Sequence, residues 1–139
     1  MRTRYKDLFE RMLDPDPIAA DAAFDAVLFD RGGALPDLVE CLRRSPTDSV
    51  LRFLCVQLLG FSGAKAAVPP LIDALDDKEA FVRAEACRSL EDLNAYEAIA
   101  PLRCRLDDLD DLVRLAAAEA ILGIEGRGID GRGGDDASL

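Results

Sequence analysis

The sequence has no histidine among its 139 residues. Histidine is the usual general base near neutral pH and a common zinc ligand, so its absence removes a central residue from both kinds of site. Cysteine does not replace it, because the cysteines stand well apart and form no Cys-x-x-Cys pair. They are Cys41, Cys55, Cys87 and Cys104. We therefore predict no metal site and no cofactor, and we expect reduced thiols in a helical core, with disulfides as the less favoured alternative.

Long apolar runs are also missing. No segment approaches the roughly 18 consecutive apolar residues of a membrane-spanning helix. The opening segment MRTRYKDLFERML carries acidic residues where a signal peptide keeps an apolar stretch. Of all residues, 50% are hydrophobic and 32% are charged, which is the balance of a globular domain that folds in water. We expect one cytoplasmic domain that is monomeric and does not bind a membrane.

Motifs that carry catalysis are absent or incomplete. Gly126, Gly128 and Gly131 spell Gly-x-Gly-x-x-Gly, but a helical pattern precedes them where a dinucleotide site needs a strand. The acidic run from Asp107 to Asp111 resembles the start of a calcium loop, yet neither the glycine turn nor the closing glutamate follows. No nucleophile stands beside a recognisable base. The sequence therefore predicts no catalytic residues, and we expect that the chain is not an enzyme.

What the sequence does contain is a pattern that recurs every 31 residues. Arg52 returns as Arg83 and again as Arg114, each after a leucine or a valine. Self-similarity at such a period is typical of repeat proteins, in which each unit stacks on its neighbours. A degenerate first copy carries Asp21 where the others carry arginine, and we expect this copy to cap the array. The four predicted units cover residues 5–33, 34–66, 67–97 and 98–125.

Each unit has the signals of a helix, a turn and a second helix. In the third copy, Val68, Leu71 and Leu75 recur at steps of three and four, as on one face of an α-helix. Prolines open the first helices, and acidic residues fill the turns, where a carboxylate can cap the following helix. The sequence predicts an all-α fold, a short α-solenoid or superhelix of about four antiparallel helix pairs over residues 1–125. The glycine-rich tail, residues 126–139, is expected to be disordered.

The third and fourth units share the pattern Ala-[Val/Ile]-x-Pro-Leu-x-x-x-Leu-Asp-Asp, followed by [Phe/Leu]-Val-Arg-x-x-Ala. This pattern is similar to the short HEAT-like repeats of the bilin-lyase type. The resemblance implies a scaffold whose second helices line a concave binding face. It also implies an arginine ladder that links adjacent units. In this sequence the ladder would consist of Arg52, Arg83 and Arg114, with Asp77 and Asp108 as the turn partners.

The charge balance argues against a nucleic-acid partner. The formal net charge is −10, whereas binding to phosphates needs a basic face. Arg43 and Arg44 form a local basic pair in the loop before Pro46, but two arginines are too few. The acidic turns would line one edge of the array. They either attract a basic protein or only cap helices and keep the domain soluble.

Polar side chains on the second helices are the candidate partner-binding residues. They are Arg52, Gln57, Arg83, Glu85, Arg88, Arg114 and Glu119. Their alternating charge suits a protein or peptide with a basic or mixed-charge surface, although solvated helix faces look the same. We therefore predict a non-catalytic protein–protein interaction scaffold or adaptor, for example an inhibitor or immunity-type binder of a basic partner. The alternative, implied by the resemblance, is a small bilin-lyase-type subunit that holds a tetrapyrrole together with a partner chain.

Overall fold

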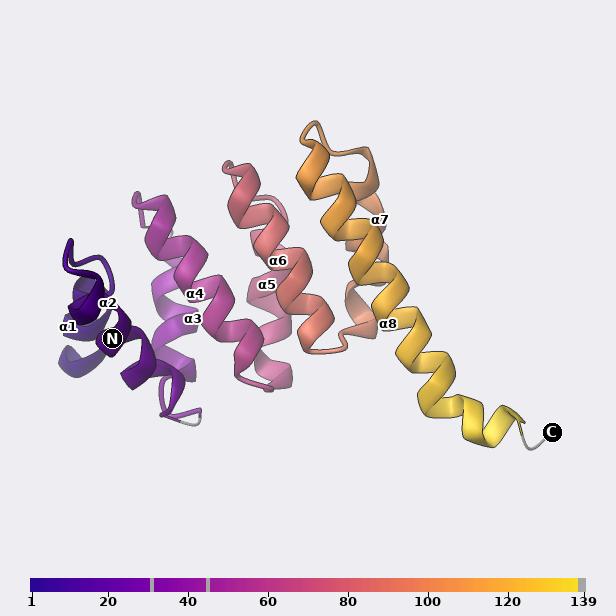
Figure 1. Cartoon of the computed structure of the whole chain (residues 1–139), viewed down its shortest axis with the longest axis horizontal. Coiled ribbons are helices and arrows are strands. Elements are labelled where there is room, and N and C mark those ends of the chain that lie inside the picture. The colour runs from indigo at the N-terminus through magenta and orange to yellow at the C-terminus, as the bar shows by residue number, and fades with distance from the viewer. Residues whose placement is uncertain (31, 45, 138–139) are drawn as a thin grey trace.

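The computed structural model describes residues 1–30, 32–44 and 46–137, with side chains as far as residue 127. In this part of the chain every regular element is helical, and the α-helices form an elongated row of four antiparallel pairs (Figure 1). The first helices of the pairs are α1 (Thr3–Arg11), α3 (Leu35–Arg43), α5 (Val68–Ala74) and α7 (Ile99–Cys104). The second helices are α2 (Pro17–Leu28), α4 (Ser49–Phe61), α6 (Ala80–Asp92) and α8 (Asp111–Ala137). Short 3-10 turns lie at η1 (Lys65–Ala67), η2 (Tyr96–Ala98) and η3 (Arg105–Asp107). The predicted all-α solenoid is confirmed.

Carboxylates cap three of the four second helices, and α6 is the exception, since the Glu79 side chain makes no capping hydrogen bond. Asp16 accepts the backbone N–H of Ile18 at 3.1 Å, and Asp48 accepts that of Val50 at 2.9 Å. Asp110 makes the same kind of bond at the start of α8. These bonds satisfy N–H groups that have no partner inside the helix, and they place a negative charge at the positive end of the helix dipole. Asp16, Asp48 and Asp110 are thus helix caps.

Equivalent positions of the four units can be found by counting residues from the cap of each second helix. The residues in the cap position of α2, α4, α6 and α8 are Asp16, Asp48, Glu79 and Asp110. The seventh residue after the cap is buried in every unit; these residues are Ala23, Cys55, Ala86 and Ala117. The fourth residue after the cap is, in order, Ala20, Arg52, Arg83 and Arg114. Ala20, and not Asp21, therefore stands in the arginine position of the first unit, because its cap precedes the next one by 32 residues rather than 31.

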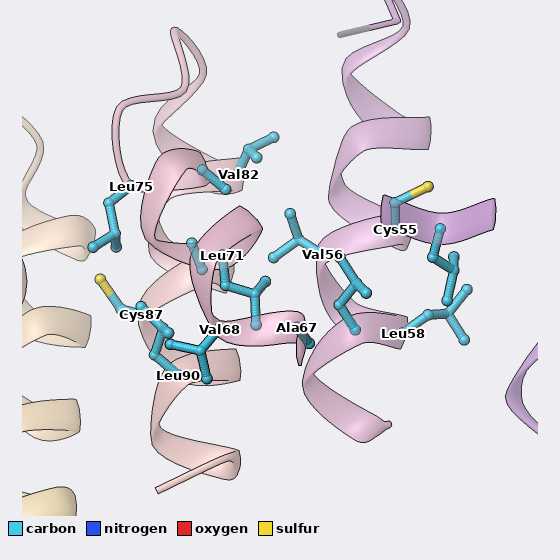
Figure 2. Close-up of a cluster of buried hydrophobic side chains, with 14 of the residues drawn as sticks. Cys55, Val56, Leu58, Ala67, Val68, Leu71, Leu75, Val82, Cys87 and Leu90 are labelled. Carbon is cyan, nitrogen blue, oxygen red and sulfur yellow. The ribbon is translucent and has the colours of Figure 1, made fainter. Parts of the chain in front are cut away.

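The core lies between two layers of helices. In Figure 1, α4, α6 and α8 stand side by side in one layer, with α3, α5 and α7 behind them. Leu71 of α5 is fully buried and lies between Val56 of α4 and Leu90 of α6 (Figure 2). Val113 and Ile124 extend the core along α8. Each unit buries its apolar surface against its neighbours, so the core runs along the array instead of filling one centre.

Small residues allow α4 and α6 to approach each other closely. A Cβ atom at Gly60 would lie 2.9 Å from the Cα atom of Ser89, so a larger residue does not fit at this helix separation. The Ser89 hydroxyl is buried at the same crossing and donates to the carbonyl oxygen of Val56 at 3.0 Å. The separation of these two helices is therefore fixed by a glycine, a serine and one hydrogen bond.

The last helix differs from the expectation for the tail. α8 continues to Ala137, so the backbone of residues 126–137 is helical where the sequence analysis expects disorder. No proline follows Pro101, so nothing in this segment blocks helical hydrogen bonding. Residues 138 and 139 lie outside the described part, and the domain boundary at residue 125 stays a prediction. Neither α8 nor any other helix in the described part is both long and apolar enough to cross a membrane.

The cysteines lie in two environments. Cys41, Cys55 and Cys87 are buried, as the sequence analysis expects, whereas Cys104 is exposed. The prediction of a core thiol is wrong for Cys104, which is the last residue of the short helix α7 and is not covered there. The sulfur atoms of Cys41 and Cys55 lie 3.7 Å apart between α3 and α4. This distance is that of two thiols in contact, since a disulfide bond is about 2.05 Å long.

Candidate functional site

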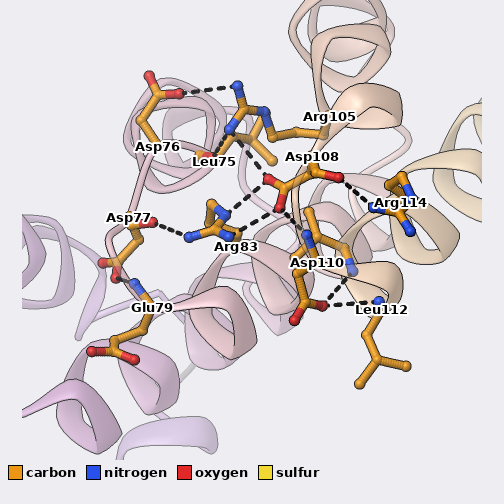
Figure 3. A network of polar contacts seen from close by, with 11 residues as sticks. Leu75, Asp76, Asp77, Glu79, Arg83, Arg105, Asp108, Asp110, Leu112 and Arg114 are labelled. Carbon is orange, nitrogen blue, oxygen red and sulfur yellow. Dashed lines mark hydrogen bonds and ion pairs between the residues drawn. The ribbon is translucent and has the colours of Figure 1, made fainter.

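Two bidentate ion pairs join the second helices of units 2 to 4. The Nε and Nη2 atoms of Arg52 on α4 donate to the Asp77 carboxylate at 2.8 and 3.0 Å. The same two atoms of Arg83 on α6 donate to Asp108 at 2.9 and 3.0 Å (Figure 3). Each aspartate lies in the turn before the second helix of the following unit. Parallel bonds of this kind fix the relative position of the two groups.

Each ladder residue is also tied to its own unit. The Nη1 atom of Arg83 donates to the carbonyl oxygen of Asp77 at 2.8 Å, and that of Arg52 donates to Pro46 at 2.7 Å. Asp108 accepts the backbone N–H of Asp110 at 3.0 Å. The bonds from Arg83 hold the pKa of Asp108 below its ordinary value, against the opposing effect of burial. These contacts lock the turns as well as the joints between units.

The ladder uses two of the arginines that the sequence analysis lists as partner-binding candidates. The Arg52 side chain is only 3% exposed, and Arg83 is half-buried, so their guanidinium groups face turn oxygens and not solvent. Arg114 is 41% exposed and pairs with Asp111 of its own helix. We call each arginine–aspartate pair of the ladder a rung. Arg105, which the sequence analysis missed, joins the second rung, Arg83–Asp108, because its Nη1 atom lies 3.4 Å from the Asp108 carboxylate. Whether any of these arginines also binds a partner stays a prediction.

The remaining candidates occupy one level of the second helices. Gln57, Arg88 and Glu119 are each the ninth residue after the cap, on α4, α6 and α8. Arg88 and Glu119 are exposed, and Gln57 is half-buried. Glu85 is nearly buried and accepts from Arg88 at 3.2 Å. Burial raises the pKa of Glu85, since the charged form loses solvent there. The structure therefore brings these polar side chains into a row of mixed charge.

A second row on the same helices is apolar, and the sequence analysis missed it. The second residue after the cap is an exposed apolar side chain in every unit. These residues, the apolar row, are Ile18 (80% exposed), Val50 (50%), Phe81 (43%) and Leu112 (64%). Phe53 extends the row, since its ring centroid lies 5.8 Å from that of Phe81. The recurrence of one apolar residue two places after each cap was visible in the sequence, but its exposure was not.

The opposite side of the array carries a groove between α3 and α5. Its volume is about 530 Å³. The apolar part of its lining consists of Val39, Leu42, Pro69 and Pro70. Charged side chains of both signs line the rest, among them Arg43 of the basic pair noted in the sequence. The ladder residues Arg52 and Asp77 border this groove, so a ligand here would lie against the joint between units 2 and 3.

Comparison with known proteins supplies the family. The profile described as HEAT repeats matches residues 35–122, which is more than half of the chain. The structure is similar to that of human deoxyhypusine hydroxylase in complex with glycerol, with a TM-score of 0.69 and 27% sequence identity. The match covers 88% of this chain and 43% of that protein, so the chain spans less than half of the enzyme's length. A comparison with curated protein sequences gave no match.

The similarity to an enzyme contradicts the prediction that the chain is not an enzyme. That prediction was drawn from motifs that the sequence lacks, and a missing motif excludes only the chemistry that the motif carries. In the residues that the structure describes, no three or more histidine, cysteine, aspartate or glutamate side chains are grouped so that they could hold a metal ion. The comparison therefore overturns the prediction without assigning an activity to this chain, which covers 43% of that enzyme.

Proposed function

Because the chain belongs to the HEAT repeat family and is a helical repeat scaffold, we propose that it is an adaptor that binds another protein through its second helices. The apolar row is the observation that carries this proposal. Exposed apolar residues that occur singly are normal on a protein surface. A repeated set at one position of successive units is different, because the stacking of units aligns it into a continuous strip.

The apolar row and the polar row supply the two parts of a protein interface. Burying one leucine, valine or phenylalanine side chain contributes about 1.5–3 kcal/mol when the burial is complete. The polar residues beside the strip would form the rim and select the charge of the partner. Exposed acids, among them Asp25, Asp92 and Glu119, accompany Arg88 on the second helices. This excess supports a partner with a basic or mixed-charge surface.

The test is retention of a partner on the immobilised chain. Cell extract would be passed over the wild type and over a double variant of the apolar row, Val50→Ser with Leu112→Ser. Both side chains are at least half exposed, so the variant should fold, which circular dichroism would check. We expect the wild type to retain a protein that the double variant retains roughly tenfold less, as for the loss of central apolar contacts.

A matched control separates the row from general stickiness. Leu109 is 98% exposed in the turn before α8 and lies outside the apolar row, so Leu109→Ser removes a similar apolar group at another place. The adaptor proposal expects this control to retain the partner as the wild type does. Equal retention by the double variant and the wild type would move the binding site to the groove or the turns.

A second candidate function is enzymatic. The observation in its favour is the similarity to deoxyhypusine hydroxylase, at 27% identity over most of this chain. Under this proposal the repeats of this chain contribute to a hydroxylase, and they correspond to 43% of that protein. A deoxyhypusine-bearing protein would be incubated with the chain, alone and with the retained partner, in the presence of dioxygen and a two-electron reductant. Hydroxylation would add the mass of one oxygen atom, because one atom of dioxygen enters the new C–O bond and the other leaves as water. An unchanged mass in both mixtures would remove this candidate.

A further inference from the structure

Arg114 is the last arginine of the ladder, and it supplies the arginine of a further rung without the aspartate. The Nη1 atom of Arg114 donates to the carbonyl oxygen of Asp108, as that of Arg83 donates to Asp77. The bidentate pair to a following unit is missing in the described part of the chain, and the guanidinium instead pairs with Asp111 on its own helix. Its exposure, 41% against 3% for Arg52, reflects this open position. Arg114 is thus built like a ladder arginine and lacks a carboxylate from another unit.

The opposite end of the array has the other half. Asp14 lies two residues before the cap of α2, as Asp77 and Asp108 do before the caps of their helices. Its Oδ1 atom accepts the backbone N–H two residues on at 2.8 Å, and the same atom of Asp77 does so at 2.9 Å. The Asp14 side chain is exposed, and no arginine in the described part of the chain pairs with it. Asp14 therefore has the local geometry of a ladder aspartate without a donor.

Apolar positions at the two ends match in the same register. Between units 2 and 3, Phe53, the fifth residue after its cap, packs on Phe81, the second residue after the next cap. The equivalent positions at the two ends of the array are Leu115 and Ile18, and both are exposed. Leu122, also exposed, stands where Gly60 stands on α4. In unit 2 the fifth and twelfth residues after the cap, Phe53 and Gly60, are half-buried and buried, whereas the residues at these positions on α8, Leu115 and Leu122, are exposed.

We propose that copies of this chain associate end to end, with the last unit of one copy stacked on the first unit of the next. Arg114 would pair with Asp14 of the second copy, and Leu115 would pack on its Ile18. The second copy is the occupant because one chain carries both halves of the missing rung, with opposite charge and in matching register. The contact is heterologous, so it builds open chains of copies, or rings where the rotation between copies closes, instead of two-fold dimers. This proposal departs from the monomer expected from the sequence and does not depend on the adaptor function.

Sedimentation velocity of the full chain tests the proposal. We expect species heavier than a monomer that grow with protein concentration and recede as salt is added, since the joint includes an exposed ion pair. Arg114→Glu and Asp14→Lys should each require roughly tenfold higher concentration for the same degree of assembly. Arg43→Glu, an equal charge change on α3 away from both ends, should assemble as the wild type does. A wild type that remains monomeric at every concentration would overturn the proposal.

Mixing the two variants gives the sharper outcome. In an equal mixture, the new carboxylate at position 114 of one variant can pair with the new lysine at position 14 of the other. Their unchanged ends can also pair, so assembly should return in the mixture. Leu115→Ser, at an exposed site that leaves the charges in place, should weaken assembly too. Assembly that both charge variants retain, or a mixture that stays monomeric while the wild type assembles, would contradict this joint.

Discussion

At the scale of single residues, the carboxylate of Asp108 binds more groups of the protein than the carboxylate of its neighbour Asp107 does. It binds Arg83, Arg105 and the backbone N–H of Asp110, and its side chain is nearly buried. Asp107, one residue earlier, is exposed. Two adjacent aspartates of one acidic turn therefore have different roles, one in the joint between units and one on the surface.

This difference predicts unequal effects of the same substitution. Asp108→Asn leaves the Arg83 guanidinium facing a neutral group at a buried joint, and we expect it to lower the free energy of unfolding by about 2 kcal/mol. Asp107→Asn should change it by less than about 0.5 kcal/mol. Urea unfolding of the two variants beside the wild type would measure both. Equal losses would show that the rung adds no more than a surface charge does.

The same carboxylate predicts how stability depends on pH. The pKa of Asp108 is lowered in the folded state from its ordinary value of 3.8, so the folded state binds this proton more weakly than the unfolded state does. Its contribution to stability is therefore present above about pH 4 and is lost as pH falls through the lowered pKa. The difference in unfolding free energy between the wild type and Asp108→Asn should shrink below pH 4. A difference that stays constant down to pH 2.5 would contradict this linkage.

The thiols of Cys87 and Cys104 should differ in reactivity, because one is buried and the other is exposed. Burial raises the pKa of Cys87 to about 12, so its reactive thiolate is scarce at neutral pH. Cys104 is exposed on α7 and can meet a reagent in water. Brief treatment of the folded protein with iodoacetamide, followed by peptide mass spectrometry, should label Cys104 first and leave Cys87 unlabelled. Rapid labelling of Cys87 would mean that α6 opens much more often than its buried core indicates.

At the scale of elements, two glycines on second helices have opposite expected effects. Gly60→Ala would place a Cβ atom 2.9 Å from the Cα atom of Ser89 and force α4 and α6 apart, so we expect a loss of about 2 kcal/mol. Gly126→Ala meets nothing within 4 Å and removes a poor helix former from α8, so we expect a gain of up to about 1 kcal/mol. Thermal unfolding of both variants would test the pair, and a stabilising Gly60→Ala would contradict the close crossing.

At the scale of the whole molecule, the first pair of helices is joined to the rest differently. The ladder positions between units 1 and 2 hold Ala20 and Pro46, which cannot form an ion pair. Arg2 takes over part of this role, since its Nε atom donates to the buried carboxylate of Asp37 on α3 at 2.9 Å. Arg2 itself is exposed, so this joint is open to water where the two ladder rungs are closed.

Hydrogen exchange should reveal this uneven coupling. Local opening depends on how strongly a segment is held by its neighbours, so amides of α1 and α2 should exchange through a lower-energy opening than those of α4 and α6. Arg2→Ala should speed exchange in α1 and α2 and leave α6 unchanged. Uniform protection across the second helices of all four units would show that apolar packing alone equalises the joints.

The repeat made most of the fold predictable from the sequence. One period places Arg52 and Arg83 at equivalent sites, and the helical spacing of apolar residues defines the pairs. The apolar row could not be predicted as exposed, because exposure of Val50 depends on which neighbour covers it and not on its own helix. Arg105 was missed since its counterpart one period earlier is Ala74, so no repeated pattern marks it. An argument from the repeat finds only residues that recur at equivalent positions, so it cannot find a residue such as Arg105 that occurs in a single unit.

The difference between the one joint without an arginine–aspartate pair and the two joints with one also determines how the molecule would respond to a pulling force. Load applied between the two ends passes through each joint in series, so the weakest joint yields first. The joint without a ladder rung, between Ala20 and Pro46, is then the place where the chain would lengthen. Units 2 to 4, which Arg52 and Arg83 hold together, would stay stacked as a stiff segment. The first pair of helices would separate from them at a lower force.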